Sequence, residues 1–436
     1  MEEKLSLKQL IWIGTGHVIG AGVVSIVGSA IAVTGYSVWL AFAVACLLSF
    51  IRILPVIFFN SAVIAEGGRY GMITRCAGQQ YGGLITLSGL LNWSARGTAV
   101  VALGGYILDY IPAVNSKAVT LAVWTVFCIA NLYGINMMSR IQSIATPLLL
   151  AALALFSAAC IFNMQNNCFD FSSEYMFTGG SRGFFTTVVL LSYSCDGIAS
   201  LANYSTQTEN PLKNIPLAMI AVSGITTVIY ILVGIASIAV LPLDKISGRT
   251  LIVTAEYVLP PFMFNLFVLC GPVMALVTTM NAGIPDSALP VMAGVKEGWL
   301  PQWLAKQNRY GAYYVSVIII YIIGAMPVLL DFSVAQIASI TMVLSRLAAV
   351  LLIVSAVNFP FVFKKQWERS FMHIPLPVYF LSVIRCAVIE MFVVVKALRE
   401  LTPGMVVLNI ILLVACVGYG IVKMKQINNN SENFIK

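Results

Sequence analysis

Long stretches without a charged residue constrain this chain more than any other feature. Asp, Glu, Lys and Arg are absent from five runs, at residues 9–51, 141–169, 214–243, 257–285 and 401–422. A helix needs about 20 apolar residues to cross a bilayer, and lipid leaves backbone polar groups to be satisfied within a helix or a closed barrel. The runs predict an all-α polytopic membrane protein instead of a series of soluble domains.

Composition supports this interpretation. Of the 436 residues, 10% are charged and 59% hydrophobic, whereas a soluble domain carries about 25% charged residues. The net charge is +8, and the charged residues lie mainly between hydrophobic segments. We therefore expect the positive residues to set the orientation of the chain in the membrane, and we predict no nucleic-acid partner. The nine cysteines are scattered without a C-x-x-C pair, so neither a metal site nor a disulfide framework is expected.

The hydropathy pattern predicts twelve transmembrane helices. Residues 34–36, Thr-Gly-Tyr, supply a turn between the first two, and residues 163–181 form an external loop. The polar start lacks a cleavage site, so we expect helix 1 to serve as its own insertion signal. The predicted helices span residues 8–33, 36–62, 82–110, 117–135, 139–162, 182–206, 214–241, 258–292, 312–330, 333–357, 374–395 and 402–423.

The distribution of Lys and Arg orients these helices. With the N-terminus inside, cytoplasmic segments hold fifteen Lys and Arg residues and external segments hold six. Cytoplasmic loops carry the excess of positive residues in membrane proteins. The sequence therefore predicts a multi-pass protein of the cell membrane with both termini in the cytoplasm.

Two predicted helices carry matching interruptions. Helix 1 has four glycines within residues 14–22, and helix 6 places Asp196 and Gly197 at bilayer depth. Paired interruptions indicate inverted repeats with a binding site between them. We expect one repeat in residues 1–162, a second in residues 163–357 after the external loop, and two appended helices in residues 358–436. Helix packing through Gly16 and Gly20 is the alternative for helix 1.

Interrupted helices suit a zwitterionic solute. Free N–H groups at a half-helix N-terminus attract a carboxylate, and free carbonyls accept from an ammonium group. Glycine permits the unwinding and a close approach to the backbone. The pattern predicts a carrier for amino acids or related amines.

Several motifs resemble the amino acid–polyamine–organocation superfamily of permeases. Residues 16–23, GHVIGAGV, are similar to its helix 1 signature G-x-x-I-G-x-G-[IV], and residues 193–197, YSCDG, are similar to F-x-F-D-G of helix 6. Residues 209–216 resemble K-N-P-x-R-x-I-P, and residues 292–311 resemble the loop after helix 8. The motifs occur in the family's order across nearly the whole chain.

The resemblance implies the leucine-transporter-type fold with a 5+5 inverted repeat, discontinuous helices 1 and 6, and alternating access. It implies that main-chain N–H groups of Ala21, Gly22 and Val23 bind a carboxylate, that carbonyls of Val18, Tyr193 and Asp196 face an amino group, and that the Tyr193 ring caps the substrate. The full predicted substrate site comprises His17, Val18, Ile19, Gly20, Ala21, Gly22, Val23, Arg96, Tyr193, Ser194, Asp196 and Gly197.

The sequence leaves the coupling ion of transport open, because it departs from the family pattern in helix 5. Many proton-coupled relatives carry a lysine in helix 5 that mimics a bound sodium ion, where this chain has Leu148, Leu149 and Leu150. One hypothesis is sodium, held by carbonyls near Gly16 and Ile19 and by the hydroxyl of Thr278 or Thr279. The other is exchange without a coupling ion. No other cofactor is expected.

Ionisable residues at bilayer depth are candidates for function because they are costly there. Arg96 could bind a second carboxylate on the substrate, or form an ion pair with Asp196 or Asp286. His17 could carry a coupling proton or touch the substrate, or be a neutral imidazole bonded to a freed carbonyl. For Arg385 and Glu390 in helix 11 we expect a structural role or a dimer contact. The remaining candidates are Arg52 and Arg346.

Other classes explain the pattern less well. No TVGYG-like filter is present, as a potassium-type channel would need, and no H-E-x-x-H or G-x-S-x-G motif suggests an enzyme. A membrane sensor that binds amino acids with little transport, and an exchanger of acidic amino acids that uses Arg96, are kept as alternatives. The sequence leaves a monomer and a homodimer equally open.

Overall fold

The computed structural model describes residues 4–110, 115–332, 334–399 and 402–435, and in these ranges the chain is helical apart from connecting loops and one isolated bridge. Six of its apolar stretches are long enough to cross a membrane, from Ile26–Asn60 to Pro403–Gln426, and three shorter apolar helices accompany them. The prediction of an all-α polytopic membrane protein agrees with this architecture.

The helices follow one another in this order: α1 (Leu7–Val18), α2 (Ala21–Thr34), α3 (Val38–Asn60), α4 (Arg69–Cys76), α5 (Gly82–Leu91), α6 (Arg96–Tyr110), α7 (Ser116–Leu132), α8 (Gly134–Phe162), α9 (Gly180–Ser194), α10 (Pro211–Ala239), α11 (Leu243–Ile246), α12 (Leu251–Val258), α13 (Pro261–Val268), α14 (Met274–Lys296), α15 (Tyr314–Leu329), α16 (Val334–Val362), α17 (Lys364–Glu368), α18 (Leu376–Arg399) and α19 (Pro403–Ile435). Tighter turns join several of them, notably the 3-10 segments η3 (Asn92–Ala95) and η4 (Ile198–Gln207).

Local sequence explains where the first elements begin and end. The Ser6 hydroxyl accepts from the Gln9 main-chain N–H while the Gln9 side chain accepts from the Ser6 N–H, a capping box that starts α1. Between α2 and α3, Gly35 has φ +69° and an added Cβ would lie 2.2 Å from the Tyr175 carbonyl oxygen. Only glycine fits there, which confirms the predicted turn and fixes it against the loop at residues 163–179.

Two predicted helices are segmented in the structure outside the helix 1 and helix 6 interruptions. The predicted span 82–110 contains η3 between α5 and α6, and the span 258–292 begins at Pro261 and passes through a π-helical turn at Leu269–Val273. Pro272 in that turn has no N–H to give to the ladder, which accounts for the irregular turn. Short helices α4, α11, α12 and α17 occupy predicted loops, and α19 continues to Ile435, beyond the predicted end at 423.

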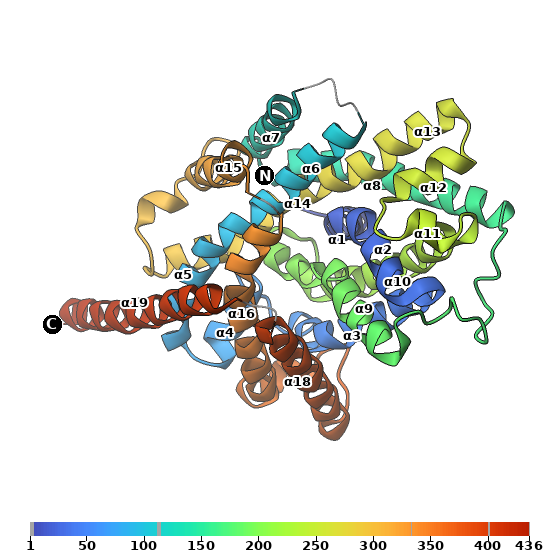
Figure 1. The fold of residues 1–436 in the computed structure, drawn as a ribbon. Coiled ribbons are helices and arrows are strands. Elements are labelled where there is room, and N and C mark those ends of the chain that lie inside the picture. The colour runs from blue at the N-terminus through green and yellow to red at the C-terminus, as the bar shows by residue number, and fades with distance from the viewer. Residues whose placement is uncertain (1–3, 111–114, 333, 400–401, 436) are drawn as a thin grey trace.

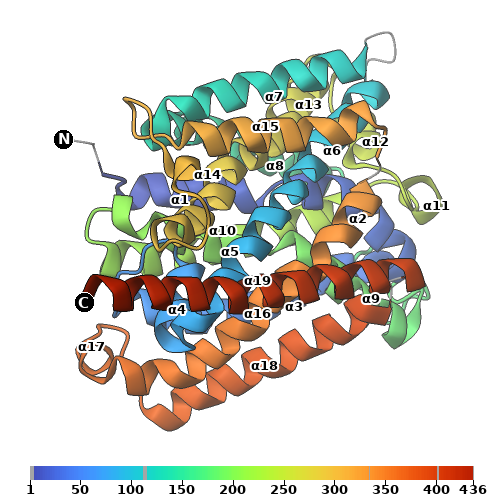
Figure 2. The same cartoon turned by 90° about the vertical axis from the view of Figure 1, so that its left-hand side faces the viewer.

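The long helices run side by side (Figures 1 and 2). In Figure 2, α7 and α15 form the upper edge and α18 the lower edge, with α1 between them. The start of α1 and the end of α19 lie at the same end of the bundle. Helix α18 packs on α3 and α16, and α19 packs on α5 and α16.

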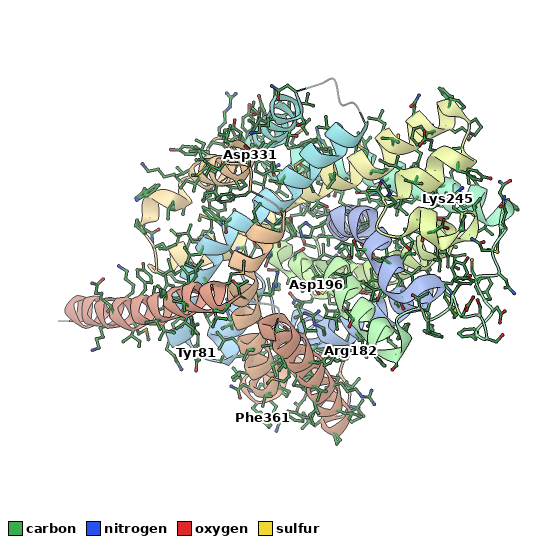
Figure 3. All side chains as sticks on the ribbon, in the orientation of Figure 1. Tyr81, Arg182, Asp196, Lys245, Asp331 and Phe361 are labelled. Atoms are coloured by element: carbon green, nitrogen blue, oxygen red, sulfur yellow. The ribbon has the colours of Figure 1, made fainter. Side chains whose placement is uncertain are left out.

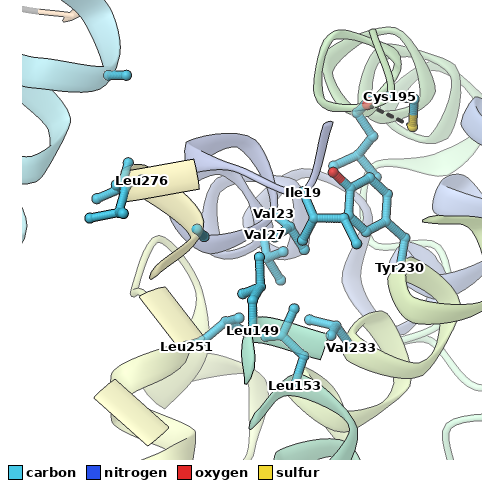
Figure 4. Close-up of a cluster of buried hydrophobic side chains, with 14 of the residues drawn as sticks. Ile19, Val23, Val27, Leu149, Leu153, Cys195, Tyr230, Val233, Leu251 and Leu276 are labelled. Atoms are coloured by element: carbon cyan, nitrogen blue, oxygen red, sulfur yellow. Dashed lines mark hydrogen bonds between the residues drawn. The ribbon is translucent and has the colours of Figure 1, made fainter. Parts of the chain in front are cut away.

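An apolar cluster fixes α2 against its neighbours. Figure 4 shows Val23 and Val27 of α2 facing Leu149 and Leu153 of α8, and all four are fully buried. Burying such side chains stabilises packing by about 1.5–3 kcal/mol each in water, although in lipid the gain comes from close packing. The half-helix after the first interruption is therefore held rigidly.

Candidate functional site

A cavity of about 680 Å³ lies in the middle of the molecule. A volume of this size suits a small ligand. Of the residues predicted for the substrate and sodium sites, the following line it: His17, Val18, Gly20, Arg96, Ser194, Asp196, Gly197 and Thr279. Figure 3 places Asp196 among the central helices, far from the labelled peripheral residues.

The first interruption separates α1 from α2. Ile19 has ψ 81° and Gly20 has φ −126° and ψ −146°, so two residues leave the helical path. The Gly20 N–H closes a short turn on the Val18 carbonyl at 2.9 Å. Helix α2 then starts at Ala21 without a side-chain cap, so its first N–H groups lack intrahelical acceptors. The predicted discontinuity of helix 1 is confirmed.

The second interruption follows α9. Cys195, Asp196 and Gly197 form a turn, Gly197 has φ +114°, and the chain continues as η4. A Cβ added at Gly197 would lie 3.0 Å from Cδ2 of His17 and 3.4 Å from a Val18 methyl. The predicted discontinuity of helix 6 is therefore also confirmed, and the two interruptions are in direct contact.

One side chain that sequence reasoning missed joins both interruptions. The Tyr230 hydroxyl in α10 lies 3.0 Å from the Val18 carbonyl oxygen and 2.9 Å from the Ser194 carbonyl oxygen, and Tyr230 is fully buried. Its single proton is donated to one carbonyl at a time. A tyrosine in the middle of a predicted transmembrane helix is the one signal that could have pointed to it.

Asp196 is held by an ion triad with Arg52 and Glu390. Arg52 Nη1 in α3 lies 2.9 Å from Asp196 Oδ1, and Arg52 Nη2 lies 2.8 Å from Glu390 Oε2 in α18. Glu390 is 3% exposed. The predicted alternative of an Arg96–Asp196 pair is therefore wrong, and so is a dimer contact for Glu390, because this carboxylate faces the interior of its own chain.

Arg96 stands apart from these pairs. In the part of the chain that the structure describes, its guanidinium forms no ion pair with Asp286 or any other carboxylate, and its Nε is buried without a hydrogen-bond partner. It packs against α14, where a Cβ at Gly283 would lie 2.6 Å from Nη1. Arg96 is thus a cation that lines the cavity with donors available.

Comparison with known proteins agrees with this geometry. Residues 5–431 match the model of the family described as amino acid permease. An uncharacterized protein of Methanocaldococcus jannaschii is 26% identical over 78% of this chain and 79% of its own. The inner membrane transport protein YbaT of Escherichia coli is 23% identical over 79% of this chain and 81% of its own, and the branched-chain amino acid permease BcaP of Bacillus subtilis is 23% identical over 57% of each.

The chain belongs to the amino acid permease family. The resemblance to the amino acid–polyamine–organocation superfamily is thereby confirmed, and relatives of this chain are named as transport proteins and permeases.

His17 in this permease has a carboxylate neighbour. Its Nε2 lies 3.6 Å from Asp286 Oδ2, and its Nδ1 is buried without a partner. Asn203 Nδ2 in η4 donates to Asp286 Oδ1 at 2.8 Å. The expected bond between His17 and a freed carbonyl is absent from the described hydrogen bonds, so Asp286 is the group that positions the imidazole.

The residues of the sodium hypothesis lie close to α1. A Cβ added at Gly16 would lie 2.3 Å from the Thr146 hydroxyl and 3.1 Å from Cβ of Thr278, and a Cβ at Gly20 would lie 2.1 Å from the Thr279 hydroxyl. Gln142 Nε2 donates to the Thr278 carbonyl at 3.2 Å. The hydroxyls of Thr278 and Thr279 donate their protons to helix carbonyls. The lone pairs of the two hydroxyl oxygens could therefore face a cation.

Some predicted residues contribute in other ways or lie outside the description. Ile19 and Val23 are fully buried in the apolar cluster, so only their main chain could serve the site. The side chains of Ala21, Tyr193 and Arg346 lie outside the described part of the structure, and so does the burial of Gly22. The predicted capping role of the Tyr193 ring therefore remains a prediction.

Proposed function

We propose that this permease carries an amino acid or a closely related amine across the cytoplasmic membrane by alternating access. The single observation that supports this most is the contact of two main-chain interruptions at one cavity, through Gly197, His17 and Val18. The N–H groups at the start of α2 would receive the substrate carboxylate, and carbonyls at the ends of α1 and α9 would face its ammonium group.

The proposal includes the architecture expected from the family resemblance. Twelve crossings result if the segments on either side of each interruption count as one helix. The first repeat then ends with α8, at the predicted boundary of residue 162. The second runs from α9 to α16, which ends at Val362, five residues after the predicted boundary of 357, and α18 and α19 are appended. Both termini would lie in the cytoplasm, which agrees with their shared end of the bundle (Figure 2).

The substrate class follows from Arg96. A guanidinium at bilayer depth that forms no ion pair with a described carboxylate is costly unless an anion accompanies it. A substrate with a second carboxylate supplies that anion and matches the guanidinium in a bidentate contact. We infer that this permease prefers acidic amino acids, because the carboxylates of the cavity have other neighbours. Arg52 engages Asp196 and Glu390, and Asp286 lies against His17 and accepts from Asn203.

Three hypotheses for coupling predict different outcomes. If sodium occupies the region of Gly16, Ile19, Thr278 and Thr279, uptake requires a sodium gradient and is weakened in Thr279→Ala. If the His17–Asp286 pair binds a proton, uptake follows a pH gradient and His17→Gln removes that dependence. Exchange without coupling predicts uptake only when the opposite side of the membrane contains substrate.

The proposed function is tested by binding and by flux. A thermal-shift screen of the purified protein should show stabilisation by glutamate or aspartate, because a ligand that binds only the folded state raises the melting temperature. Counterflow in liposomes should be saturable and stereoselective. Stabilisation without counterflow would favour the alternative of a sensor.

Arg96 gives the sharpest test of the substrate class. Arg96→Gln should weaken stabilisation by glutamate about tenfold or more in concentration, since a charge-assisted pair is lost, and should leave glutamine unaffected. Arg182→Gln, which changes an exposed arginine in α9, is the matched control. If neutral amino acids stabilise the wild type and acidic ones do not, the inferred preference is wrong.

A further inference from the structure

A second cavity lies apart from the central one. It measures about 650 Å³ and shares no lining residue with the substrate cavity. Its walls come from the start of the chain at Lys4, the junction of α7 and α8, the end of η4, and the segment at residues 307–313 before α15. It therefore opens at the end of the bundle where α1 begins (Figure 2).

Hydrogen bonds and close packing fix the two loops that form this cavity. Asn308 Nδ2 donates to the Leu132 carbonyl at 2.6 Å, and the Asn308 side-chain oxygen accepts from the N–H groups of Tyr310 and Ala312. Gly134 has φ +84°, and a Cβ there would lie 2.5 Å from the Tyr310 carbonyl oxygen. The rings of Tyr133 and Tyr310 are 5.1 Å apart, so the two loops form one preorganised wall.

Three cations converge on this cavity from separate parts of the sequence. Lys4, Arg140 and Arg309 line it, and its described lining contains no Asp or Glu. None of the three forms an ion pair with a described carboxylate. The Arg309 guanidinium lies 4.7 Å from the centre of the Tyr310 ring, which holds it in place. The positive-inside rule places Lys and Arg in cytoplasmic loops but does not require them to line one concave site.

Main-chain donors add to this charge. Helix α8 has 29 residues and starts beside Tyr133, whose side chain forms no cap hydrogen bond. Gly134, Ile135 and Asn136 of its first turn line the cavity. The first N–H groups of a helix lack intrahelical acceptors and carry the positive end of the helix dipole. These three residues line the same cavity as the three cations.

We propose that this cavity binds an anion that bears a phosphate group, at the membrane surface where α1 begins. A phosphate offers several acceptor oxygens and a charge of about −1 as a diester or near −2 as a monoester, which suits two guanidinium groups, an ammonium group and a helix N-terminus better than one carboxylate does. The apolar side chains of Met137, Leu289 and Val317 complete the lining and accommodate an organic portion. The site is separate from the proposed transport function.

Two sources present this chemistry, an anionic lipid headgroup and a soluble phosphate compound, and one experiment separates them. Melting temperatures are measured in nanodiscs of phosphatidylcholine alone, with added phosphatidylglycerol, and with millimolar inorganic phosphate. The double variant R140Q/R309Q is compared with the wild type and with R182Q, the control at an exposed arginine in α9. Glutamate-induced stabilisation is recorded on every sample.

We expect phosphatidylglycerol or inorganic phosphate to stabilise the wild type and R182Q, with about tenfold weaker apparent affinity in R140Q/R309Q. Stabilisation by phosphatidylglycerol without stabilisation by inorganic phosphate identifies the lipid headgroup as the ligand. Stabilisation by inorganic phosphate in nanodiscs of phosphatidylcholine identifies a soluble phosphate compound. If neither probe stabilises the wild type, or if R140Q/R309Q responds as R182Q does, the proposal is overturned. Retained stabilisation by glutamate in R140Q/R309Q shows a folded protein and separates this result from failure of the proposed function.

Discussion

The two helix interruptions differ in what holds them open. The first, at Ile19 and Gly20, contains no charge and is bounded by apolar side chains that pack on α8 (Figure 4). The second, at residues 195–197, contains Asp196, which Arg52 fixes to α3 and, through Glu390, to α18. The first interruption therefore depends on space beside a glycine, and the second depends on a charge network.

The difference assigns separate tasks to the two segments. Uncharged main-chain donors at α2 gain most from an anionic group, because nothing in the first interruption neutralises them. The second interruption presents carbonyls and a carboxylate whose charge is already balanced by Arg52. Substitutions at the first interruption should act mainly on ligand affinity, and substitutions at the second should act first on folding.

The largest expected effect is from Arg52→Gln. It leaves the carboxylates of Asp196 and Glu390 without this guanidinium, and removal of one partner from a buried ion pair costs about 3–5 kcal/mol. We expect a clearly lower melting temperature in detergent. The double variant Arg52→Gln with Glu390→Gln should regain part of the loss, while Arg182→Gln should melt like the wild type. Equal stability of Arg52→Gln and Arg182→Gln would contradict a structural role for the triad.

Gly20→Ala tests the space at the first interruption. The new methyl group would lie 2.1 Å from the Thr279 hydroxyl, and such overpacking costs about 1–3 kcal/mol. Amino acid-induced stabilisation should be lost or strongly weakened. Gly224→Ala is the matched control, because a Cβ there meets nothing within 4 Å. Adding Thr279→Ala to Gly20→Ala should restore folding, and full recovery of ligand affinity in Gly20→Ala alone would refute a close approach of the ligand.

Gly197→Ala examines the backbone of the second interruption. Its φ of +114° disfavours a side chain, and the methyl group would press on His17 at 3.0 Å. A residue with a Cβ in a left-handed conformation loses about 1–2 kcal/mol. Gly180→Ala is the control, because Gly180 has φ +58° and a Cβ there meets nothing within 4 Å. It measures the cost of the left-handed backbone without a steric clash. We expect Gly197→Ala to lower both melting temperature and substrate affinity, and Gly180→Ala only the former.

The smallest expected effect is from Tyr230→Phe. Loss of one hydroxyl that donates to the Val18 or Ser194 carbonyl should cost about 1 kcal/mol. The predicted result is a modest fall in melting temperature and a faster exchange of amides near both interruptions. Tyr257→Phe, at an exposed tyrosine of α12, serves as the control. Unchanged amide exchange in Tyr230→Phe would mean that Tyr230 does not link the two segments.

Much of this fold was predictable because lipid leaves few choices. Charge-free runs indicated about half of the predicted crossings. Clustered glycines indicated the interruption at Gly20, and a charge beside a glycine indicated the one at Asp196 and Gly197. The segmented helices were not predictable with the same accuracy, since the π-helical turn beside Pro272 and the 3-10 turn at η3 depend on local packing. Short helices such as α4 and α12 lie at positions that hydropathy interprets as loops.

The candidate site was only partly predictable. His17, Arg96 and Asp196 stood out as polar residues at bilayer depth, but the partners of His17 and Asp196 lie far away in the chain. Asp196 and Glu390 are separated by nearly two hundred positions, and both meet Arg52. Tyr230 resembled any other aromatic residue of a buried helix.

The sequence by itself determined that the chain is helical in a membrane and that two segments abandon helical hydrogen bonding, because composition and glycine content act locally along the chain. Only the tertiary structure decided that these segments touch, that Arg52 rather than Arg96 balances Asp196, and that Lys4, Arg140 and Arg309 face one cavity. Such pairings depend on helix packing in three dimensions, where residues remote in sequence are brought within hydrogen-bonding distance.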